Sequence, residues 1–267
     1  MSGFASVVIT GASRGLGAAL ARRFAAPGVR LLLVARSEDA LRGVAAECAA
    51  RGAQAEVAAL DVRDAAALAA ALAAFEAGGP VELAIANAGT SAGTAPDGGP
   101  EGRPEGTPET GAEAAAQVAV NLLGAINLVG PLLPGMIARR RGGIGLVASV
   151  AAFRGLPDTP GYCASKAGLV AWGEALRAAH GPQGVRVTVL CPGFFDSAMG
   201  DRYRGPKPLR MGLETAAARC HAALVAGRAR VVFPASVGWL LRLLALLPPG
   251  LGDRAVRLVR YRVEPER

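Results

Sequence analysis

The chain has 267 residues, of which 52% are hydrophobic and 19% charged, a composition that excludes a disordered protein and allows a substantial buried core. The net charge is +8, and the whole excess lies in residues 201–267, which carry 13 basic and 5 acidic residues. A basic segment can meet acidic ligands, anionic lipid or nucleic acid, but without aromatic interleaving or a nucleic-acid motif we expect no nucleic-acid partner.

Short apolar runs alternate with helical periodicity along most of the chain. Runs that are apolar at every position indicate strands buried on both faces of a parallel sheet. We expect strands at residues 4–10, 30–35, 56–60, 81–86, 144–148, 185–190 and 229–233. Helices are expected at residues 18–26, 38–51, 65–75, 113–133, 161–179 and 216–226. The alternation predicts one α/β domain over residues 1–234, with helices covering both faces of the sheet.

Two segments depart from this alternation. Residues 90–112 are rich in Gly, Pro and Thr, which predicts either a mobile loop or the lead-in to a helix. Residues 235–267 form a C-terminal extension whose apolar run is interrupted by Arg242 and is far shorter than the roughly 20 residues that span a bilayer. Residues 255–263 then alternate Arg with aliphatic side chains.

The basic amphipathic extension has two interpretations. It can lie on a membrane surface, or it can pack on the same domain and cover the substrate cleft or a subunit interface. We favour packing, because apolar stripes are usually buried against protein.

Cysteine and histidine usage indicates neither disulfides nor a metal site. The four cysteines are scattered without a C-x-x-C pair, and the two histidines are isolated in the sequence. In a chain of this length we expect reduced, packed thiols and no metal. The N-terminus leads almost directly into a strand pattern, so we expect no signal peptide and a cytoplasmic protein.

A glycine-rich turn joins the first expected strand and helix, and it reads TGASRGLG over residues 10–17. Glycines let the backbone turn sharply and approach a pyrophosphate, while the helix N-terminus supplies free N–H groups. We therefore expect a dinucleotide to be bound by Gly11, Ser13, Arg14, Gly15, Leu16 and Gly17.

The end of the second expected strand bears on the choice of cofactor. Sites for NAD usually place an acid there to accept from the ribose 2′-hydroxyl, whereas this chain has Arg36. Arg36 and Arg14 could together hold a 2′-phosphate, which favours NADP over NAD. The alternative is that both are ordinary solvated arginines in an Arg-rich chain.

The stretch at residues 149–166 carries the strongest catalytic signal. Ser149 follows an apolar run, and Tyr162 and Lys166 are four residues apart at the start of a helix, so they share one helical face. The chain has 27 Arg and only 2 Lys, and a guanidinium could not replace a titratable amine at position 166. The Tyr–Lys pair alone fits an ordinary amphipathic helix equally well. With the added hydroxyl it forms a device for proton transfer.

These motifs together resemble the short-chain dehydrogenase/reductase family, over about residues 4–234. The supporting motifs are the T-G-x-x-x-G-x-G turn, the Y-x-x-x-K pair, the Asp61-Val62 pair, Asn87-Ala88-Gly89, Asn121 in VNLLG, Ser149 and Pro192-Gly193. The resemblance implies a doubly wound, Rossmann-like three-layer sandwich with a seven-stranded parallel sheet, in a homodimer or homotetramer.

The resemblance also implies roles for individual residues. Asn121, Ser149, Tyr162 and Lys166 would be catalytic, with Lys166 also binding the nicotinamide ribose. Further contacts to the cofactor are expected from Asp61 and Val62 near the adenine, from Asn87, Ala88 and Gly89 at the central strand, and from Pro192, Gly193, Phe195 and Ser197 near the nicotinamide. Ser197 stands where many relatives have Thr.

We therefore expect an NADP(H)-dependent oxidoreductase that interconverts a carbonyl and an alcohol on a small molecule, with Tyr162 as general acid/base. A free phenol has a pKa near 10, and Lys166 together with the oxidised nicotinamide is expected to lower it. Two alternatives remain. One is a membrane-peripheral lipid or fatty-acyl reductase docked by its basic tail, and the other is a non-catalytic nucleotide-binding protein on the same fold.

Overall fold

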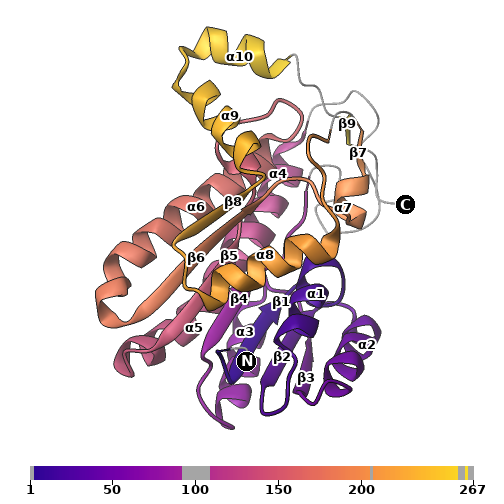
Figure 1. The fold of residues 1–267 in the computed structure, drawn as a ribbon, viewed down its shortest axis with the longest axis vertical. Helices are drawn as coiled ribbons and strands as arrows, with labels where there is room; N and C mark the ends of the chain where they lie inside the picture. The colour runs from indigo at the N-terminus through magenta and orange to yellow at the C-terminus, as the bar shows by residue number, and fades with distance from the viewer. Residues whose placement is uncertain (1–2, 92–108, 205–206, 258–261, 264–267) are drawn as a thin grey trace.

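A parallel sheet of seven strands runs through the centre of the molecule (Figure 1). The computed structural model describes residues 3–91, 109–204, 207–257 and 262–263. In the sheet the order is β3-β2-β1-β4-β5-β6-β8, which confirms the expected doubly wound fold. The strands are β1 (Ser6–Thr10), β2 (Arg30–Ala35), β3 (Gln54–Ala59), β4 (Leu83–Ala86), β5 (Gly142–Val147), β6 (Val185–Pro192) and β8 (Arg230–Phe233).

Helices cover both faces of this sheet and give the expected three layers. Successive strand residues point to opposite faces, so Val7 and Ile9 of β1 pack into one core and Val8 into the other. The first core is closed by α1 (Gly15–Phe24), α2 (Glu38–Ala49) and α8 (Leu213–Val225). The second is closed by α3 (Ala65–Glu76), α5 (Gly124–Ala138) and α6 (Pro160–His180).

The helix expected at residues 113–133 is longer than predicted. It begins as α4 (Gly111–Val118), passes through a π-helical turn at Ala119–Leu123 and continues as α5. Thr110 and Glu113 form a capping box that fixes its start. By length and composition this 28-residue helix could cross a membrane, but it packs into the second core through residues such as Leu128 and Leu132. Of the segment at 90–112, residues 92–108 lie outside the described part.

The C-terminal quarter contains elements that the sequence pattern did not predict. The short α7 (Ala198–Asp201) precedes β7 (Tyr203–Arg204), which pairs with β9 (Arg262–Val263) in a separate two-stranded sheet. The apolar run of the extension forms α9 (Ala235–Leu246), and α10 (Pro249–Arg257) follows it. These two helices project beyond the sheet at one end of the long axis (Figure 1). The amphipathic segment predicted at 255–263 falls partly outside the described residues.

Candidate active site

The expected site residues gather at the carboxyl ends of the central strands. The glycine-rich turn follows β1, Asn87 follows β4, Ser149 follows β5, and Pro192 ends β6. The strand order reverses between β1 and β4, and such switch points open a crevice where doubly wound sheets bind their ligands. The topology therefore brings the predicted cofactor turn and the predicted catalytic residues to one edge.

The glycine-rich turn has no room for side chains at its base. Gly11 has φ +65°, and a Cβ there would lie 2.8 Å from Cα of Ala88. A Cβ on Gly17 would lie 2.2 Å from the carbonyl oxygen of Gly11. In front of the turn the space is open, since a Cβ on Gly15 would meet no described atom within 4 Å. This backbone cradle at the start of α1 fits the pyrophosphate of a dinucleotide.

The remaining residues of the turn differ in exposure. Leu16 is buried in the first core, Ser13 is half-buried, and Arg14 is exposed at the N-cap position of α1.

Asn87 ties the turn to β4. Its amide nitrogen Nδ2 donates to the carbonyl oxygens of Thr10 at 3.0 Å and Gly11 at 3.1 Å. In return, the Thr10 hydroxyl accepts from the backbone N–H groups of Asn87 and Ala88, each at 3.1 Å. These bonds hold the ends of β1 and β4 in a fixed relation beneath the crevice.

Two arginines lie near Asp61, the residue that is predicted to contact the adenine of the cofactor. Asp61 follows β3 and accepts from Arg63 through both carboxylate oxygens, at 3.1 Å and 2.8 Å. The hydrogen bonds from Arg63 hold the pKa of Asp61 below its usual value, and the charge of Arg36 adds to this. Arg36 itself is exposed at the end of β2. Sequence reasoning had not singled out Arg63, although its position two residues after Asp61 was a usable signal.

Val62, the other residue predicted near the adenine, is buried and packs against the start of α5. It lies so close to Gly124 that a Cβ there would come within 2.6 Å of a Val62 methyl group. Its side chain therefore serves packing in the protein itself.

Asn121 lies in the π-helical turn and is 1% exposed. Its side-chain oxygen accepts from the N–H of Thr90 at 2.8 Å, and Nδ2 donates to the Thr90 carbonyl at 3.0 Å and to Oγ of Ser165 at 2.9 Å. Ser165 in turn donates to the carbonyl oxygen of Tyr162 at 2.8 Å. A π-turn rotates one residue out of α-helical register, and π-turns are frequent at functional sites. Here the turn links Asn121 to the first turn of α6, through a serine that sequence reasoning missed.

Ser149, Tyr162 and Lys166 meet across β5 and α6. The Ser149 hydroxyl accepts from the N–H of Ala151 at 3.1 Å, and it also hydrogen-bonds Tyr162. The ammonium Nζ of Lys166 lies 5.7 Å from the centre of the Tyr162 ring and donates to the carbonyl of Val147 at 2.8 Å. The structure thus brings Ser149 together with Tyr162 and Lys166, which follow it by 13 and 17 positions in the sequence.

Burial shifts the proton affinities of this pair in opposite directions. Burial raises the pKa of Tyr162 to about 12, and the hydrogen bond from Ser149 offsets only part of this. Burial lowers the pKa of Lys166 to about 8. We expected a lowered pKa for Tyr162; in the protein alone, desolvation of the phenolate outweighs the hydrogen bond from Ser149. The phenol is therefore neutral near pH 7 and able to donate a proton.

The loop after β6 closes the same edge. Pro192 ends the strand, and the N–H of Gly193 donates to the carbonyl of Phe233 at 2.7 Å. Phe195 forms a β-bridge with Met211. The Ser197 hydroxyl caps α7 by accepting from Gly200 at 3.0 Å, so in the protein itself it already has a structural role.

Tyr203 is a further aromatic residue near the site that sequence reasoning did not select. It is 9% exposed, and its ring meets that of Phe194 edge-on at 5.8 Å. Burial raises its pKa, and the proximity of Tyr162 adds to that shift. All four cysteines are buried free thiols, and no cluster of metal-ligating side chains occurs within the described ranges.

Comparison with known proteins gives the same assignment. Residues 5–207 match the family model of the short chain dehydrogenases. An uncharacterized oxidoreductase of Myxococcus xanthus is 34% identical over 258 residues, covering 96% of this chain and 98% of the relative. A metagenomic short-chain oxidoreductase solved in complex with NADP is 30% identical, with a TM-score of 0.71 over 87% of this chain and 97% of that one.

A short chain dehydrogenase of Mycobacterium paratuberculosis, solved bound to NAD, shares the fold with a TM-score of 0.71 at 23% identity, covering 85% of this chain and 94% of that one. The matched family model spans the glycine-rich turn, Asn121, Ser149, Tyr162 and Lys166. The chain belongs to the short-chain dehydrogenase/reductase family of NAD(P)-dependent oxidoreductases.

Proposed function

We propose that this enzyme uses NADP(H) to interconvert a carbonyl and an alcohol on a small molecule, with Tyr162 as the general acid/base. The observation that carries the proposal is the convergence of Ser149, Tyr162 and Lys166 beside the dinucleotide cradle, with Asn121 bracing the helix that bears two of them. Each side chain is of the type that carbonyl reduction needs at its position.

The chemistry follows from the properties of these residues. When bound, the nicotinamide supplies or accepts the hydride. Ser149 can donate a hydrogen bond to the substrate oxygen and so orient the carbonyl. Tyr162, kept neutral by burial, can give its proton to the oxygen as negative charge develops there. The nearby ammonium of Lys166 stabilises the phenolate that this transfer leaves.

The preference for NADP rests on the charges around the end of β2. Position 36 carries an arginine where an acid would bind the ribose 2′-hydroxyl of NAD, and Arg63 lies beside Asp61 within the same region. Planar guanidinium groups bind phosphate oxygens in a bidentate manner. The NADP bound in the 30%-identical metagenomic structure supports this proposal.

A panel of aldehydes and ketones, followed by NADPH absorbance, tests the proposal in wild type and in Tyr162→Phe. We expect wild type to consume NADPH with at least one class of carbonyl, and the variant to lose about 10²–10⁴-fold in kcat. NADPH binding, measured by nucleotide fluorescence, is expected to stay within a few-fold. Equal turnover by the two proteins would exclude the role of Tyr162, and a wild type that binds NADPH but reduces no carbonyl would favour a nucleotide-binding function.

A further inference from the structure

The hairpin formed by α9 and α10 carries most of the large hydrophobic side chains that are exposed in the described part of the chain. Nine large hydrophobic side chains are exposed in the described ranges, and six of them lie between residues 239 and 251. We call these six the α9–α10 stripe: Trp239, Leu240, Leu243, Leu246, Leu247 and Leu251. Leu246 is 81% exposed and Trp239 62%, values that a packed side chain does not have.

The stripe is the outer face of a helix whose inner face is already occupied. Gly238 is buried against β8, where a Cβ would come within 2.3 Å of a Val232 methyl group. Arg242 stacks over the ring of Phe153 at 4.1 Å. Arg242 also contacts the ring of Trp239, at 5.6 Å. Leu240 and Leu243 lie on the side of the helix away from Gly238, and each is more than half exposed.

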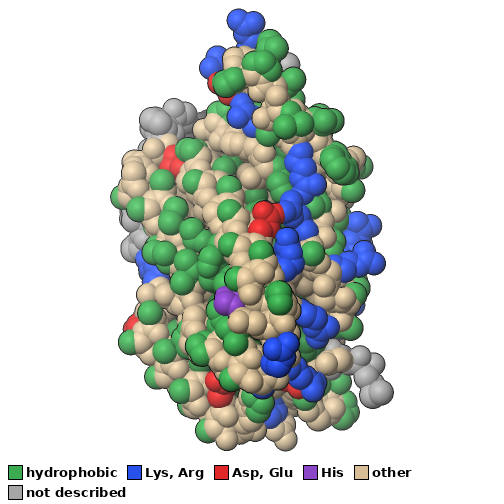
Figure 2. All heavy atoms as spheres, turned by 90° about the vertical axis from the view of Figure 1, so that its left-hand side faces the viewer, with side chains coloured by type: hydrophobic (Ala, Val, Ile, Leu, Met, Phe, Trp, Pro, Cys, Tyr) green, Lys and Arg blue, Asp and Glu red, His purple; other side chains and the backbone are tan. Residues whose placement is uncertain are grey.

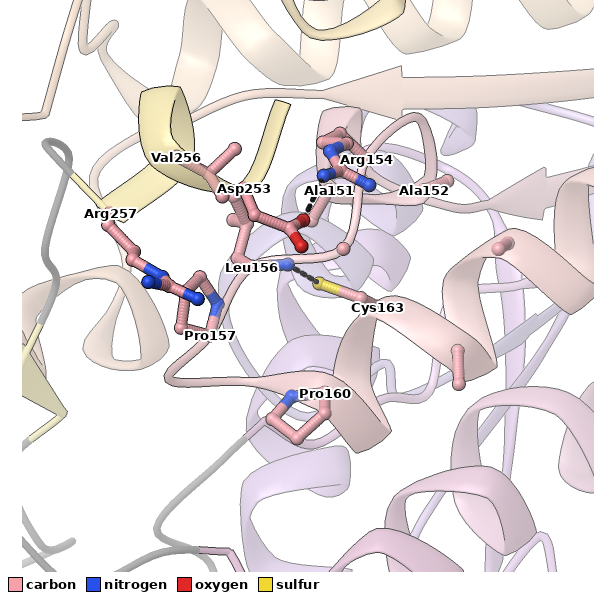
Figure 3. Close-up of a pocket in the computed structure, with 13 residues that line it drawn as sticks. Ala151, Ala152, Arg154, Leu156, Pro157, Pro160, Cys163, Asp253, Val256 and Arg257 are labelled. Carbon is pink, nitrogen blue, oxygen red and sulfur yellow. Dashed lines mark hydrogen bonds and ion pairs between the residues drawn. The ribbon is translucent and has the colours of Figure 1, made fainter. Parts of the chain in front are cut away.

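The hairpin is held in a defined position. Arg154, in the loop after Ser149, pairs with Asp253 of α10 at 2.5 Å. Val256 is 5% exposed and lines a pocket together with residues of that loop. Between α10 and the start of α6 lies a cavity of about 570 Å³, lined by Leu156, Cys163 and Val256 among others (Figure 3). None of the proposed catalytic residues lines this cavity, so it is a crevice beside the site rather than the site itself.

The charges around the stripe indicate what can cover it. Residues 235–257 carry three arginines and one acid, and that acid, Asp253, is neutralised by Arg154. Arg254 and Arg257 are exposed on α10. Figure 2 shows Lys and Arg side chains running down one side of the molecule from this end, with apolar side chains beside them at the top.

A second copy of the chain would bring two such basic ends together, which costs electrostatic free energy. An anionic surface would neutralise them.

We propose that the α9–α10 stripe docks the protein on an anionic membrane surface, with Trp239 and the leucines inserted among the acyl chains and Arg254 and Arg257 at the phosphates. A helix of 12 residues is about 18 Å long, too short to cross a hydrocarbon core of about 30 Å. It therefore lies in the plane of the interface, as other monotopic helices do. The proposal concerns the outer face of the hairpin and takes up the membrane interpretation of the extension, and it does not depend on the proposed reaction.

Vesicle co-sedimentation of the full-length protein tests the docking. Wild type is expected to sediment with vesicles of phosphatidylcholine and phosphatidylglycerol, and to bind vesicles of phosphatidylcholine alone far more weakly. Leu243→Ser with Leu246→Ser should weaken binding about tenfold or more, because two inserted side chains are lost. Arg254→Glu with Arg257→Glu should weaken it by a similar factor, and added salt should do the same.

Matched controls remove the same chemistry elsewhere. Ile126→Ser with Leu209→Ser removes two exposed aliphatic side chains outside the stripe, and Arg219→Glu with Arg228→Glu makes the same charge change on exposed arginines at α8 and just after it. Both are expected to keep nearly all of the vesicle binding.

Tryptophan fluorescence measures insertion directly. The emission of Trp239 is the part of the signal that is lost in Trp239→Phe, and lipids with brominated acyl chains should quench it only when the protein is bound to vesicles.

Several outcomes would overturn the proposal. They are a wild type that ignores anionic vesicles, a stripe variant that binds as wild type does, and a Trp239 that brominated lipid does not quench. If light scattering instead shows that Leu243→Ser with Leu246→Ser splits an oligomer while wild type ignores vesicles, the stripe is a subunit interface. Reduction of a water-soluble carbonyl should be the same in wild type and stripe variants, so failure of docking and failure of the proposed reaction are separable.

Discussion

The carboxyl edge of the sheet and the α9–α10 hairpin are fixed by different kinds of contact. At the edge, Gly11 and Gly17 leave no space for a side chain, and Asn121 makes three hydrogen bonds while almost fully buried. The hairpin is held by an ion pair, by ring contacts of Arg242, and by the buried residues Gly238, Gly252 and Val256, whereas the six side chains of its stripe stay largely exposed. Close packing fixes the positions of the atoms at the carboxyl edge to fractions of an ångström. On an exposed face, no packing fixes the side chains, and only their polarity and charge determine what can bind there.

This difference has a consequence for mutations. At the edge, a substitution acts through displaced atoms and altered proton affinity, so its effect on stability or turnover is large. On the hairpin, a substitution acts through lost affinity for whatever covers the stripe, so the isolated protein hardly responds. We therefore expect the largest effects from substitutions at the carboxyl edge and the smallest from substitutions on the hairpin.

Lys166→Met should strongly reduce turnover and stabilise the fold. The loss in kcat is expected to be about 10²-fold or more, because the phenolate of Tyr162 loses its cation. The buried ammonium is costly, since burial lowers its pKa from 10.5 to about 8. Removing it should raise the free energy of unfolding by about 1–3 kcal/mol at neutral pH.

The pH dependence of this gain has a defined sign. Below about pH 8 the lysine is charged in both states and the folded state bears the full cost, which fades as pH rises towards 10.5. The gap between the melting temperatures of Lys166→Met and wild type should therefore shrink over that interval. Lys207→Met, at the only other lysine, is the control and should show no such trend. A gap that widens with pH would contradict the assigned shift.

Gly17→Ala should destabilise the fold and weaken NADPH binding. Its Cβ would lie 2.2 Å from the Gly11 carbonyl oxygen, so the turn must shift. We expect a loss of about 1–3 kcal/mol in urea unfolding, with weaker binding in a fluorescence titration of NADPH. Gly43→Ala is the control, since its Cβ in α2 meets no described atom within 4 Å. That change should stabilise by about 0.5–1 kcal/mol, and equal behaviour of the two variants would contradict the close approach.

Arg36→Ser should lower the preference for NADPH over NADH by about tenfold, the loss expected when one charge-assisted phosphate contact is removed. The measurement is the ratio of kcat/KM for the two cofactors with one carbonyl substrate. Arg42→Ser removes an exposed arginine from α2, where it pairs with Glu38, and should leave the ratio unchanged. If the ratio is unchanged in Arg36→Ser, Arg36 does not bind the 2′-phosphate, and the contact would be assigned to Arg14 or Arg63 instead.

The smallest effect on stability is expected on the hairpin. Leu243→Ser with Leu246→Ser should change the free energy of unfolding by no more than about 0.5 kcal/mol per site, because both side chains are already in water. Leu128→Ser, in the second core, is the contrast and should cost several-fold more. Urea unfolding followed by circular dichroism compares the three proteins, and a large loss in the stripe variant would show that these leucines pack within the fold.

Local patterns in the sequence were sufficient to predict the sheet and the motifs at its edge. Apolar runs gave the seven strands to within a few residues, and the glycine-rich turn could be placed between β1 and α1. The four-residue spacing of Tyr162 and Lys166 put them on one face of α6. Such features are predictable because period, turn chemistry and short spacing act within a few residues of chain.

Other features depend on contacts between distant segments, and only the tertiary structure decided them. The Asn121–Ser165 bond joins residues 44 positions apart, and the bonds of Asn87 to the glycine-rich turn join residues 76 and 77 positions apart. The raised pKa of Tyr162 follows from its burial, which no local pattern shows. The sequence shows that the run in α9 is apolar, but it does not show which of these apolar side chains are buried and which are exposed. Whether water reaches Leu243 depends on which other elements pack over it, and here none of the described elements does.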